Sequence, residues 1–383
     1  MTEMTDITTD FAVSSISARF VGRPGSARDG FRTYERPAKL MSMAKRPLAN
    51  GMARDSDGLG EIVAWFLAQE SARERFRWVL RDSLDQLFDG ARTGRWAYQQ
   101  LSKTEKAHLG TVVEINLTKE FGLSDGEKLD WSVAGVDLDC KFSKDIGGWE
   151  IPMEMYVCAD HEGRSGEVDH PAMLVWMSDD SSEWAVGVAR VTDDRLRWTQ
   201  DKETGLKKRG YNSDNKRKFS DEGARSIYWL WGGTQLDLPE NTLLQMDDDL
   251  RRRILQEGLS GQARVNALFT ERLGVTIRRP VLLTVAQQDD APKRARDARK
   301  HLSPLGILVL GHQEAHPSIA MALGLPAPAK GEWLSVQLRA VSKADSRRKV
   351  WIDGSFWSIA DVDSCIQEAP RVPRYRLEEA PVT

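Results

Sequence analysis

One stretch, residues 128–141, constrains the fold of this chain more than any other. Its sequence, KLDWSVAGVDLDCK, alternates polar and apolar residues on both sides of a central Ala134-Gly135 pair. Alternation around a two-residue turn is typical of a β-hairpin. Counted outwards from that turn, the pairing of the two strands places Asp130 opposite Asp139.

The side chains of this hairpin divide between two faces, because side chains alternate along a strand with a period of two. Two carboxylates directly opposite each other repel and weaken a sheet. A divalent cation between them reverses that effect, and hard oxygen ligands suit Mg²⁺. The alternative is an ordinary solvated polar face, but the clustering of acids with a lysine favours the metal. The polar face comprises Lys128, Asp130, Ser132, Asp137, Asp139 and Lys141, and the core face comprises Leu129, Trp131, Val133, Val136, Leu138 and Cys140.

Length and composition set the class of protein. The chain has 383 residues, enough for two domains that each have a core. Apolar residues make up 40% and charged residues 29%, which is typical of a soluble globular protein. No apolar run approaches the roughly 20 residues of a membrane-spanning helix. The N-terminus also lacks the pattern of a signal peptide, so we expect a cytoplasmic protein with no membrane partner.

The cysteines and the net charge indicate which kinds of site and partner the protein can have. Cys140, Cys158 and Cys365 are scattered without CxxC spacing, so neither a disulfide framework nor a zinc site is indicated. The net charge of −3 is compatible with DNA binding, because the distribution of charge matters more than its sum.

The N-terminal half is predicted to form an α/β domain over residues 52–205, preceded by a flexible extension, 1–51, that is either a solvated tail or a DNA-contacting arm. Glu114 lies among apolar neighbours in residues 110–117, where it is either an edge-strand acid or a metal ligand. Helices are expected over Leu59–Phe88, with Gly90 as C-terminal cap, and over Ala97–Leu109, and further strands over Met153–Cys158, Met173–Met177 and Glu183–Val191.

A polar, basic stretch without periodicity follows, and we interpret residues 206–218 as an interdomain linker. It is either a solvated loop or a positive strap beside DNA, since phosphate neutralisation dominates affinity for nucleic acids. Its basic residues are Lys207, Lys208, Arg209, Lys216, Arg217 and Lys218.

Residues 219–361 show helices followed by strands, with a tail over 362–383. Three helices and then a hairpin is the order of a winged helix-turn-helix, whose third helix enters the DNA major groove. We expect helices over Asp247–Glu257, from Ser260 to Leu273 and over Ala291–Leu302, an apolar segment over Val281–Val285, strands over Ile307–Leu310 and Leu334–Ala340, and an Asp-Gly hairpin over Val350–Trp357. The third helix is predicted to contact DNA, rather than to present a solvated face, through Lys293, Arg294, Arg296, Arg299 and Lys300.

The spaced set Glu114, Asp130 and Asp139-Cys140-Lys141 resembles the active site of the NaeI family of restriction endonucleases, within the wider PD-(D/E)xK nuclease group. The resemblance covers roughly residues 55 to 360 and excludes both termini. Cys140 departs from the wider group, in which Glu or an apolar residue is more usual at that position. The supporting segments are DGARTGRW at 89–96, LSKTEK at 101–106, GT at 110–111, LTVAQQDD at 283–290, KRARDAR at 293–299 and GHQ at 311–313.

The resemblance implies a homodimer whose N-terminal domain is restriction-endonuclease-like, with a mixed sheet flanked by helices. It also implies a C-terminal domain similar to the DNA-binding domain of the catabolite activator protein. In that family one double-stranded DNA site is cut while a second binds the C-terminal domain as an effector. A palindromic, GC-rich site within a restriction-modification system follows from the same resemblance.

The expected reaction is Mg²⁺-dependent hydrolysis of a DNA phosphodiester. Asp130 and Asp139 would bind the metal, helped by Glu114 and the backbone carbonyl of Cys140, while Lys141 would orient the attacking water. Two alternatives remain. A DNA-binding regulator with a non-catalytic nuclease fold would bind DNA equally well in EDTA, and a nicking repair endonuclease of the MutH type would cut one strand.

Overall fold

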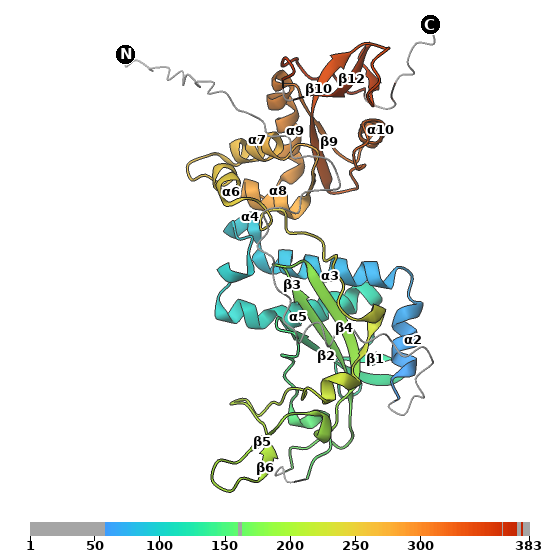
Figure 1. Ribbon diagram of the computed structural model, residues 1–383, viewed down its shortest axis with the longest axis vertical. Coiled ribbons are helices and arrows are strands. Elements are labelled where there is room, and N and C mark those ends of the chain that lie inside the picture. The colour runs from blue at the N-terminus through green and yellow to red at the C-terminus, as the bar shows by residue number, and fades with distance from the viewer. Residues whose placement is uncertain (1–57, 160–162, 362, 374–376, 378–383) are drawn as a thin grey trace. The chain divides into compact units, whose positions relative to one another are not determined.

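The structure is a computed structural model that describes residues 58–159, 163–361, 363–373 and 377 (Figure 1). The predicted N-terminal extension, 1–51, lies outside these residues, as does much of the predicted C-terminal tail. The chain divides into two units at Asp247 and Asp248. Within the described residues, no helix has both the length and the apolar character that crossing a bilayer requires.

The first unit is built on a mixed five-stranded sheet in the order β1-β2-β3-β4-β7. Strands β2 and β3 are parallel and the other neighbours are antiparallel. Nearly every residue of β3 and β4 is buried, as expected of strands covered on both faces. The strands are β1 (Trp131–Val133), β2 (Val136–Ser143), β3 (Pro171–Ser178), β4 (Glu183–Arg190) and β7 (Tyr228–Trp229), and β5 (Trp198–Gln200) pairs with β6 (Lys207–Arg209) as a separate ribbon.

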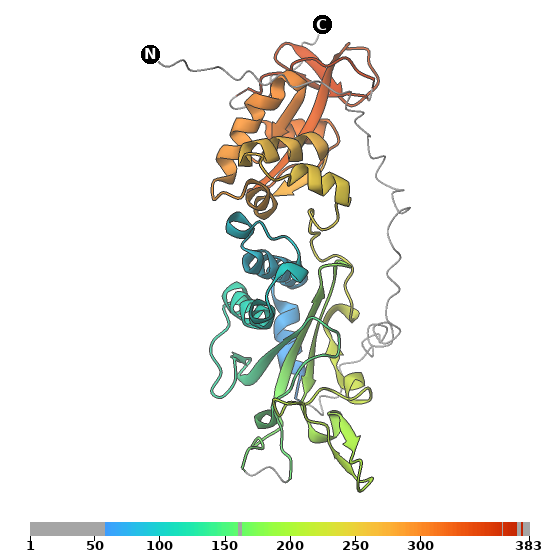
Figure 2. The same cartoon turned by 90° about the vertical axis from the view of Figure 1, so that its left-hand side faces the viewer.

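Helices cover one face of this sheet, as Figures 1 and 2 show. They are α2 (Gly60–Ala68), α3 (Ala72–Phe88) and α5 (Lys103–Phe121), and the short α4 (Gly90–Thr93) follows α3. Leu138, Cys140, Met173 and Val175 join the helices in one core. The alternate residues of β3, Ala172 and Leu174, belong to a second core on the other face, formed with Trp149, Tyr156, Leu196 and Phe219.

Helix α5 replaces the strand predicted around Glu114. Ser102 accepts a hydrogen bond from the amide of Glu105, the Glu105 carboxylate accepts one from the amide of Ser102, and Gly122 ends the helix in the left-handed conformation. Leu109, Val113, Leu117 and Phe121, spaced at every fourth residue, are buried in the core, so the segment is stabilised as an amphipathic helix. The edge-strand interpretation of Glu114 was therefore wrong.

Two further predictions in this unit are corrected. Met153–Met155 is a turn of 3-10 helix, closed by a hydrogen bond from the amide of Tyr156 to the carbonyl of Met153, where a buried strand was expected. The C-terminal cap of α3 is Asp89, not Gly90, and Gly90 begins α4. In contrast, β3 and β4 lie where the apolar runs predicted strands.

Residues 206–218 are part of the first unit and do not form an interdomain linker. Lys207–Arg209 form β6, and Arg217 is wholly buried, with its main chain paired to that of Ile151. The segment is therefore fixed by strand pairing and by a buried side chain, which a solvated linker lacks.

The second unit combines helices with strands that all pair antiparallel. Ser260 caps α7, and Asp290 caps α9, which has the bounds predicted from its alanine stripe. The predicted apolar segment, 281–285, lies inside α8, and α10 and β8 were not predicted. The helices are α6 (Asp248–Ile254), α7 (Gly261–Glu271), α8 (Arg279–Ala286), α9 (Ala291–Leu302) and α10 (His316–Ala322). Strands β11 (Val350–Ile352), β12 (Ser355–Ile359), β10 (Glu332–Val341) and β8 (Thr276–Arg278) pair in that order, and β9 (Ile307–Leu310) also pairs with β10.

Candidate active site

The β1–β2 hairpin has the register predicted from its sequence. Trp131 pairs with Leu138 and Val133 with Val136, which leaves Ala134-Gly135 as the turn. Both turn residues have positive φ, 52° at Ala134 and 77° at Gly135, as a type I′ turn requires. The hairpin therefore brings the start of β1 beside the middle of β2.

Asp130 and Asp139 meet where the β1–β2 ladder ends. The amide of Cys140 donates a 2.7 Å hydrogen bond to Oδ2 of Asp130. Asp139 is buried, with an exposed fraction of 6%. Burial raises the pKa of Asp139 to about 6, with Asp130 adding to the effect and Lys141 opposing it. The two acids thus form the repulsive pair that the sequence predicted.

Lys141 lies on the same face of β2 as Asp139, and its ammonium group forms an ion pair with Oδ2 of Asp139. Its side chain is about a quarter exposed, at 24%, so one side of the pair is open to solvent. Cys140, between the two, points to the opposite face and lies in the helix-covered core. Its thiol has a pKa well above the ordinary value because it is desolvated.

Glu114 approaches this pair from helix α5. Burial raises the pKa of Glu114, the negative charges of Asp130 and Asp139 add to the rise, and Lys141 opposes it. The carboxylate therefore belongs to the same electrostatic cluster. However, α5 packs on the sheet face of Cys140, whereas Asp139 and Lys141 project from the other face.

The donor set fits a hard divalent cation at Asp130 and Asp139. In the part of the chain that the structure describes, no group of three or more His, Cys, Asp or Glu side chains is placed to hold a metal ion. The position of α5 explains why Glu114 does not complete such a group. Mg²⁺ nevertheless needs only one or two protein carboxylates, since water and substrate phosphate supply its other ligands. The repulsion between the two desolvated acids is the feature that a cation would relieve.

Asp137 shares the polar face of the hairpin but has a different role. Its carboxylate accepts hydrogen bonds from the amides of Glu127 and Lys128, at 2.8 and 2.9 Å. The side chain of Lys128 in turn forms a 2.6 Å ion pair with Glu167. Asp137 therefore fixes the loop that leads into β1.

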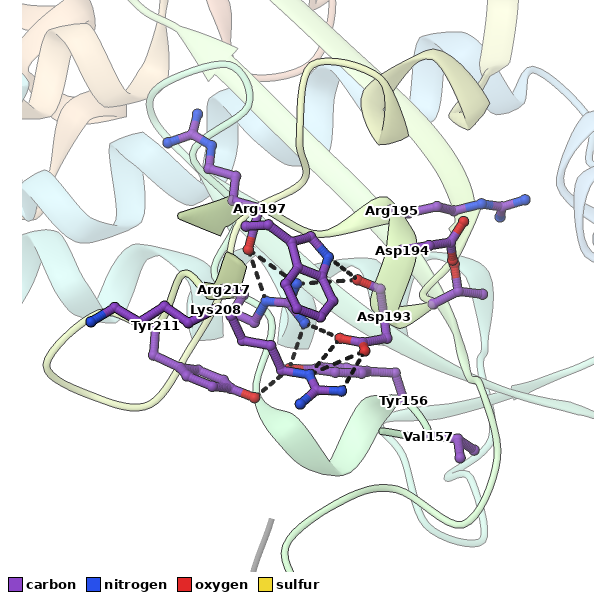
Figure 3. A network of polar contacts seen from close by, with 12 residues as sticks. Tyr156, Val157, Asp193, Asp194, Arg195, Arg197, Lys208, Tyr211 and Arg217 are labelled. Carbon is purple, nitrogen blue, oxygen red and sulfur yellow. Dashed lines mark hydrogen bonds and ion pairs between the residues drawn. The ribbon is translucent and has the colours of Figure 1, made fainter. Parts of the chain in front are cut away.

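Some basic residues of 206–218 form ion pairs within the protein, and others face solvent (Figure 3). Arg217 is wholly buried and pairs with Asp193, which also binds both Nε and Nη2 of Arg209. These two arginines are therefore not free for DNA, contrary to the sequence-based prediction. Lys216 and Lys218 are half-buried and Lys207 and Lys208 are exposed.

Comparison with known proteins identifies the family. The family model described as restriction endonuclease NaeI matches residues 61–368. The type II restriction enzyme NaeI of Lentzea aerocolonigenes is 39% identical over 344 residues, which is 88% of this chain and 100% of that protein. The chain belongs to the NaeI restriction endonuclease family.

The mixed α/β architecture is consistent with the restriction-endonuclease fold of a NaeI-family protein. The segment 89–96, which carried part of the resemblance, has a structural role. Nη1 of Arg95 forms a 2.8 Å ion pair with Glu105, and the amides of Trp96 and Ala97 both donate to Oε1 of Gln100. These contacts hold the turn that leads into α5, the helix that carries Glu114.

Helix α9 of this NaeI-family chain presents only some of its basic residues to solvent. Lys293, Arg296 and Lys300 are exposed, whereas Arg294 and Arg299 are half-buried. Nε of Arg299 donates to the carbonyl of Val309 at 2.9 Å. Nη1 of Arg294 lies 3.3 Å from Oε1 of Gln262. The two arginines, which were predicted to contact DNA, thus join α9 to β9 and α7.

Sequence reasoning missed two residues that organise these regions. Asp193 holds both Arg209 and Arg217, and His316 accepts a 3.0 Å hydrogen bond from the amide of Gly311 through Nδ1. His316 follows the Gly311-His312-Gln313 segment, which resembles the family. That proximity was the only feature of the sequence that could have pointed to His316. No local pattern pointed to Asp193.

Proposed function

We propose that this chain is a site-specific endonuclease that hydrolyses both strands of double-stranded DNA at a palindromic, GC-rich site with Mg²⁺. One observation carries the proposal. The β1–β2 hairpin brings the buried Asp139, the opposing Asp130 and the partly exposed Lys141 together in a member of a restriction endonuclease family.

Asp130 and Asp139 would hold the metal, with the Cys140 carbonyl as a further ligand and Glu114 tuning the site from α5. A bound divalent ion would polarise the scissile phosphate and lower the pKa of an attacking water. Lys141 would leave its ion pair with Asp139, orient that water and stabilise the negative charge that develops on the phosphate.

A palindromic site is cut symmetrically by a two-fold homodimer, so we infer that two copies of the chain act together. We further propose that the second unit contains a winged-helix domain, similar to that of the catabolite activator protein, which binds a second DNA site as effector. This domain would begin at residue 248 and not at the predicted residue 219, because residues 219–247 belong to the first unit and β7 pairs with β4 there. The order of α7, α8, α9 and the β11–β12 hairpin supports the winged-helix proposal, as do the exposed Lys293, Arg296 and Lys300 of α9.

Purified protein incubated with mixed plasmid DNA and Mg²⁺ tests the proposal, with the new ends then sequenced. We expect double-strand cuts at one palindrome, none in EDTA and none with Asp139→Ala or Lys141→Ala. Binding that is equal in EDTA, without any cleavage, would instead indicate a regulator. Single-strand nicks dependent on methylation or a mismatch would indicate a repair endonuclease of the MutH type.

A further inference from the structure

Strands β5 and β6 form a two-stranded ribbon that extends beyond the main sheet of the first unit (Figures 1 and 2). Trp198 pairs with Arg209, Thr199 with Lys208 and Gln200 with Lys207. All of these residues except Arg209 are exposed, and Leu206 at the tip is 70% exposed. Two strands alone are marginally stable in water, so an anchor is needed to hold this ribbon in position.

The anchor is the buried guanidinium of Arg217 (Figure 3). It is ion-paired with Asp193, donates to the carbonyl of Arg197 at 3.0 Å, and lies 5.2 Å from the ring centroid of Trp198. Arg209, at the other strand of the ribbon, is held by the same Asp193 at 2.7 Å. Both strands are therefore fixed at their root by the Asp193 carboxylate and the two arginines that it pairs with.

The ribbon root lies on the sheet face from which the proposed catalytic side chains project. Asp139 is paired with Ala172 in the parallel ladder, so the two side chains share a face. Ala172 belongs to the core that includes Leu196 and Phe219, which flank the ribbon. In the sequence, the ribbon follows the end of β4. That end pairs with the start of β3, where the parallel ladder between β3 and β2 begins at Asp139 and Ala172. A duplex over Asp139 would thus extend toward the ribbon.

The ribbon carries two polar side chains that have no partner among the described residues. Gln200 and Lys207 are directly opposite each other and share one face. Neither side chain has a hydrogen-bond or ion-pair partner among the described residues. Lys208, on the opposite face, is already paired with Asp201 at 2.8 Å. The free pair suits base edges, because Lys contacts guanine O6 and N7 and Gln contacts adenine N6 and N7.

We propose that the β5–β6 ribbon enters the major groove of the substrate duplex, and that Gln200 and Lys207 determine specificity by contacting base edges there. The major groove admits a two-stranded β-ribbon, and exposed lysines match the charge of the flanking phosphates. The inference rests on the proposed nuclease function, since it names the element that selects the site to be cut.

The test compares Gln200→Ala and Lys207→Ala with Lys208→Ala, a control that removes the same charge from the opposite face of the ribbon. Each protein is given plasmid DNA with Mg²⁺, and the cut sites are sequenced. The same proteins then select duplexes from a randomised pool in EDTA, which measures binding without cleavage. We expect Gln200→Ala and Lys207→Ala each to relax selection at one base pair of each half-site by roughly tenfold. Lys208→Ala should leave selection unchanged.

Three outcomes would overturn the proposal. Unchanged selectivity in all three variants would show that the ribbon does not contact bases. An equal loss of affinity for every sequence would show phosphate contact alone. Equal relaxation by Lys208→Ala would show that charge, and not the Gln200–Lys207 face, decides selection. A different result would separate this proposal from the nuclease function. If the wild type cuts no DNA but selects a sequence in EDTA, and Lys207→Ala does not select it, the nuclease function is wrong while the ribbon still contacts bases.

Discussion

The amide of Cys140 donates its hydrogen bond to Asp130, so the central residue of the D-x-K segment positions the acid on the neighbouring strand. Asp130→Asn should keep this contact through the amide oxygen but lose the charge. We therefore expect unfolding at or above the wild-type temperature, because the repulsion of Asp139 is removed, and cleavage reduced at least ~100-fold, the scale of losing one charge-stabilising group. Thermal melting and initial cleavage rates measure the two effects.

Asp130→Ala is the matched control for that variant. It leaves the buried amide of Cys140 without its acceptor, which should cost about 1–3 kcal/mol of unfolding free energy. If Asn and Ala at position 130 melt alike, the hydrogen bond does not position the acid.

Metal binding should depend on the buried acid of the pair. Asp139→Asn is expected to abolish heat release on titration with Mg²⁺ or Mn²⁺, because the remaining carboxylate lacks its partner. The exposed Asp125→Asn serves as the control and should titrate like the wild type. Calorimetry of DNA-free protein makes the readout independent of cleavage. A wild-type titration in Asp139→Asn would place the metal elsewhere.

The basic residues of α9 should separate into two classes. Arg299→Ala is expected to lower the stability of the second unit by about 1–3 kcal/mol, because the Val309 carbonyl loses a donor. The triple replacement of Lys293, Arg296 and Lys300 by alanine should leave melting unchanged but reduce the salt dependence of DNA binding, since these exposed cations are the ones free to displace counterions.

Denaturant unfolding and binding titrations at several salt concentrations distinguish the two classes. Normal stability of Arg299→Ala would contradict its structural role. An unchanged salt slope in the triple variant would contradict the proposed effector site. Cleavage of substrates with one and with two sites then tests activation directly.

His316 should make the second unit sensitive to acid. Burial lowers the pKa of His316 to about 4, and the nearby Arg299 and His312 add to this effect. The unfolded chain binds the proton near the ordinary value of about 6.5, so the folded state is destabilised as pH falls from 6.5 toward 4. By pH 5 the expected loss is on the order of 2 kcal/mol, and above pH 7 no loss is expected.

Urea unfolding at pH 7 and pH 5 measures this loss, with His316→Asn as the comparison. Asparagine can still accept the hydrogen bond from Gly311 but does not titrate. We expect the variant to lose less stability than the wild type over the same interval. An identical loss would assign the acid sensitivity to other groups.

Local patterns predicted the hairpin, β3, β4 and α9 because each is specified by residues close in sequence. Alternation about Ala134-Gly135 determines a register, and regularly spaced alanines between Asp290 and Leu302 determine a helix. Helix α5 was missed because Thr111, Val112, Val113 and Ile115 have side chains that favour strands, whereas its capping box and its buried stripe outweigh that preference.

Whether each arginine is buried or exposed could not be predicted from local patterns. A positive charge is usually exposed, and only a partner brought close by the fold makes its burial favourable. Arg217 meets Asp193 across 24 residues, and Arg299 reaches a carbonyl on β9. Similarly, the sequence placed Glu114 with the hairpin acids but could not show that its helix covers the opposite sheet face.

The paired root of the ribbon has a consequence for how such proteins diverge. Because Trp198 and Arg209 are paired, the ribbon begins and ends at the same place on the body of the first unit. Residues inserted or deleted between them change the length of the ribbon without displacing β2, and longer surface loops cost little conformational entropy. On the proposed function, relatives that exchange this segment would acquire new target sequences and keep the same hairpin for cleavage.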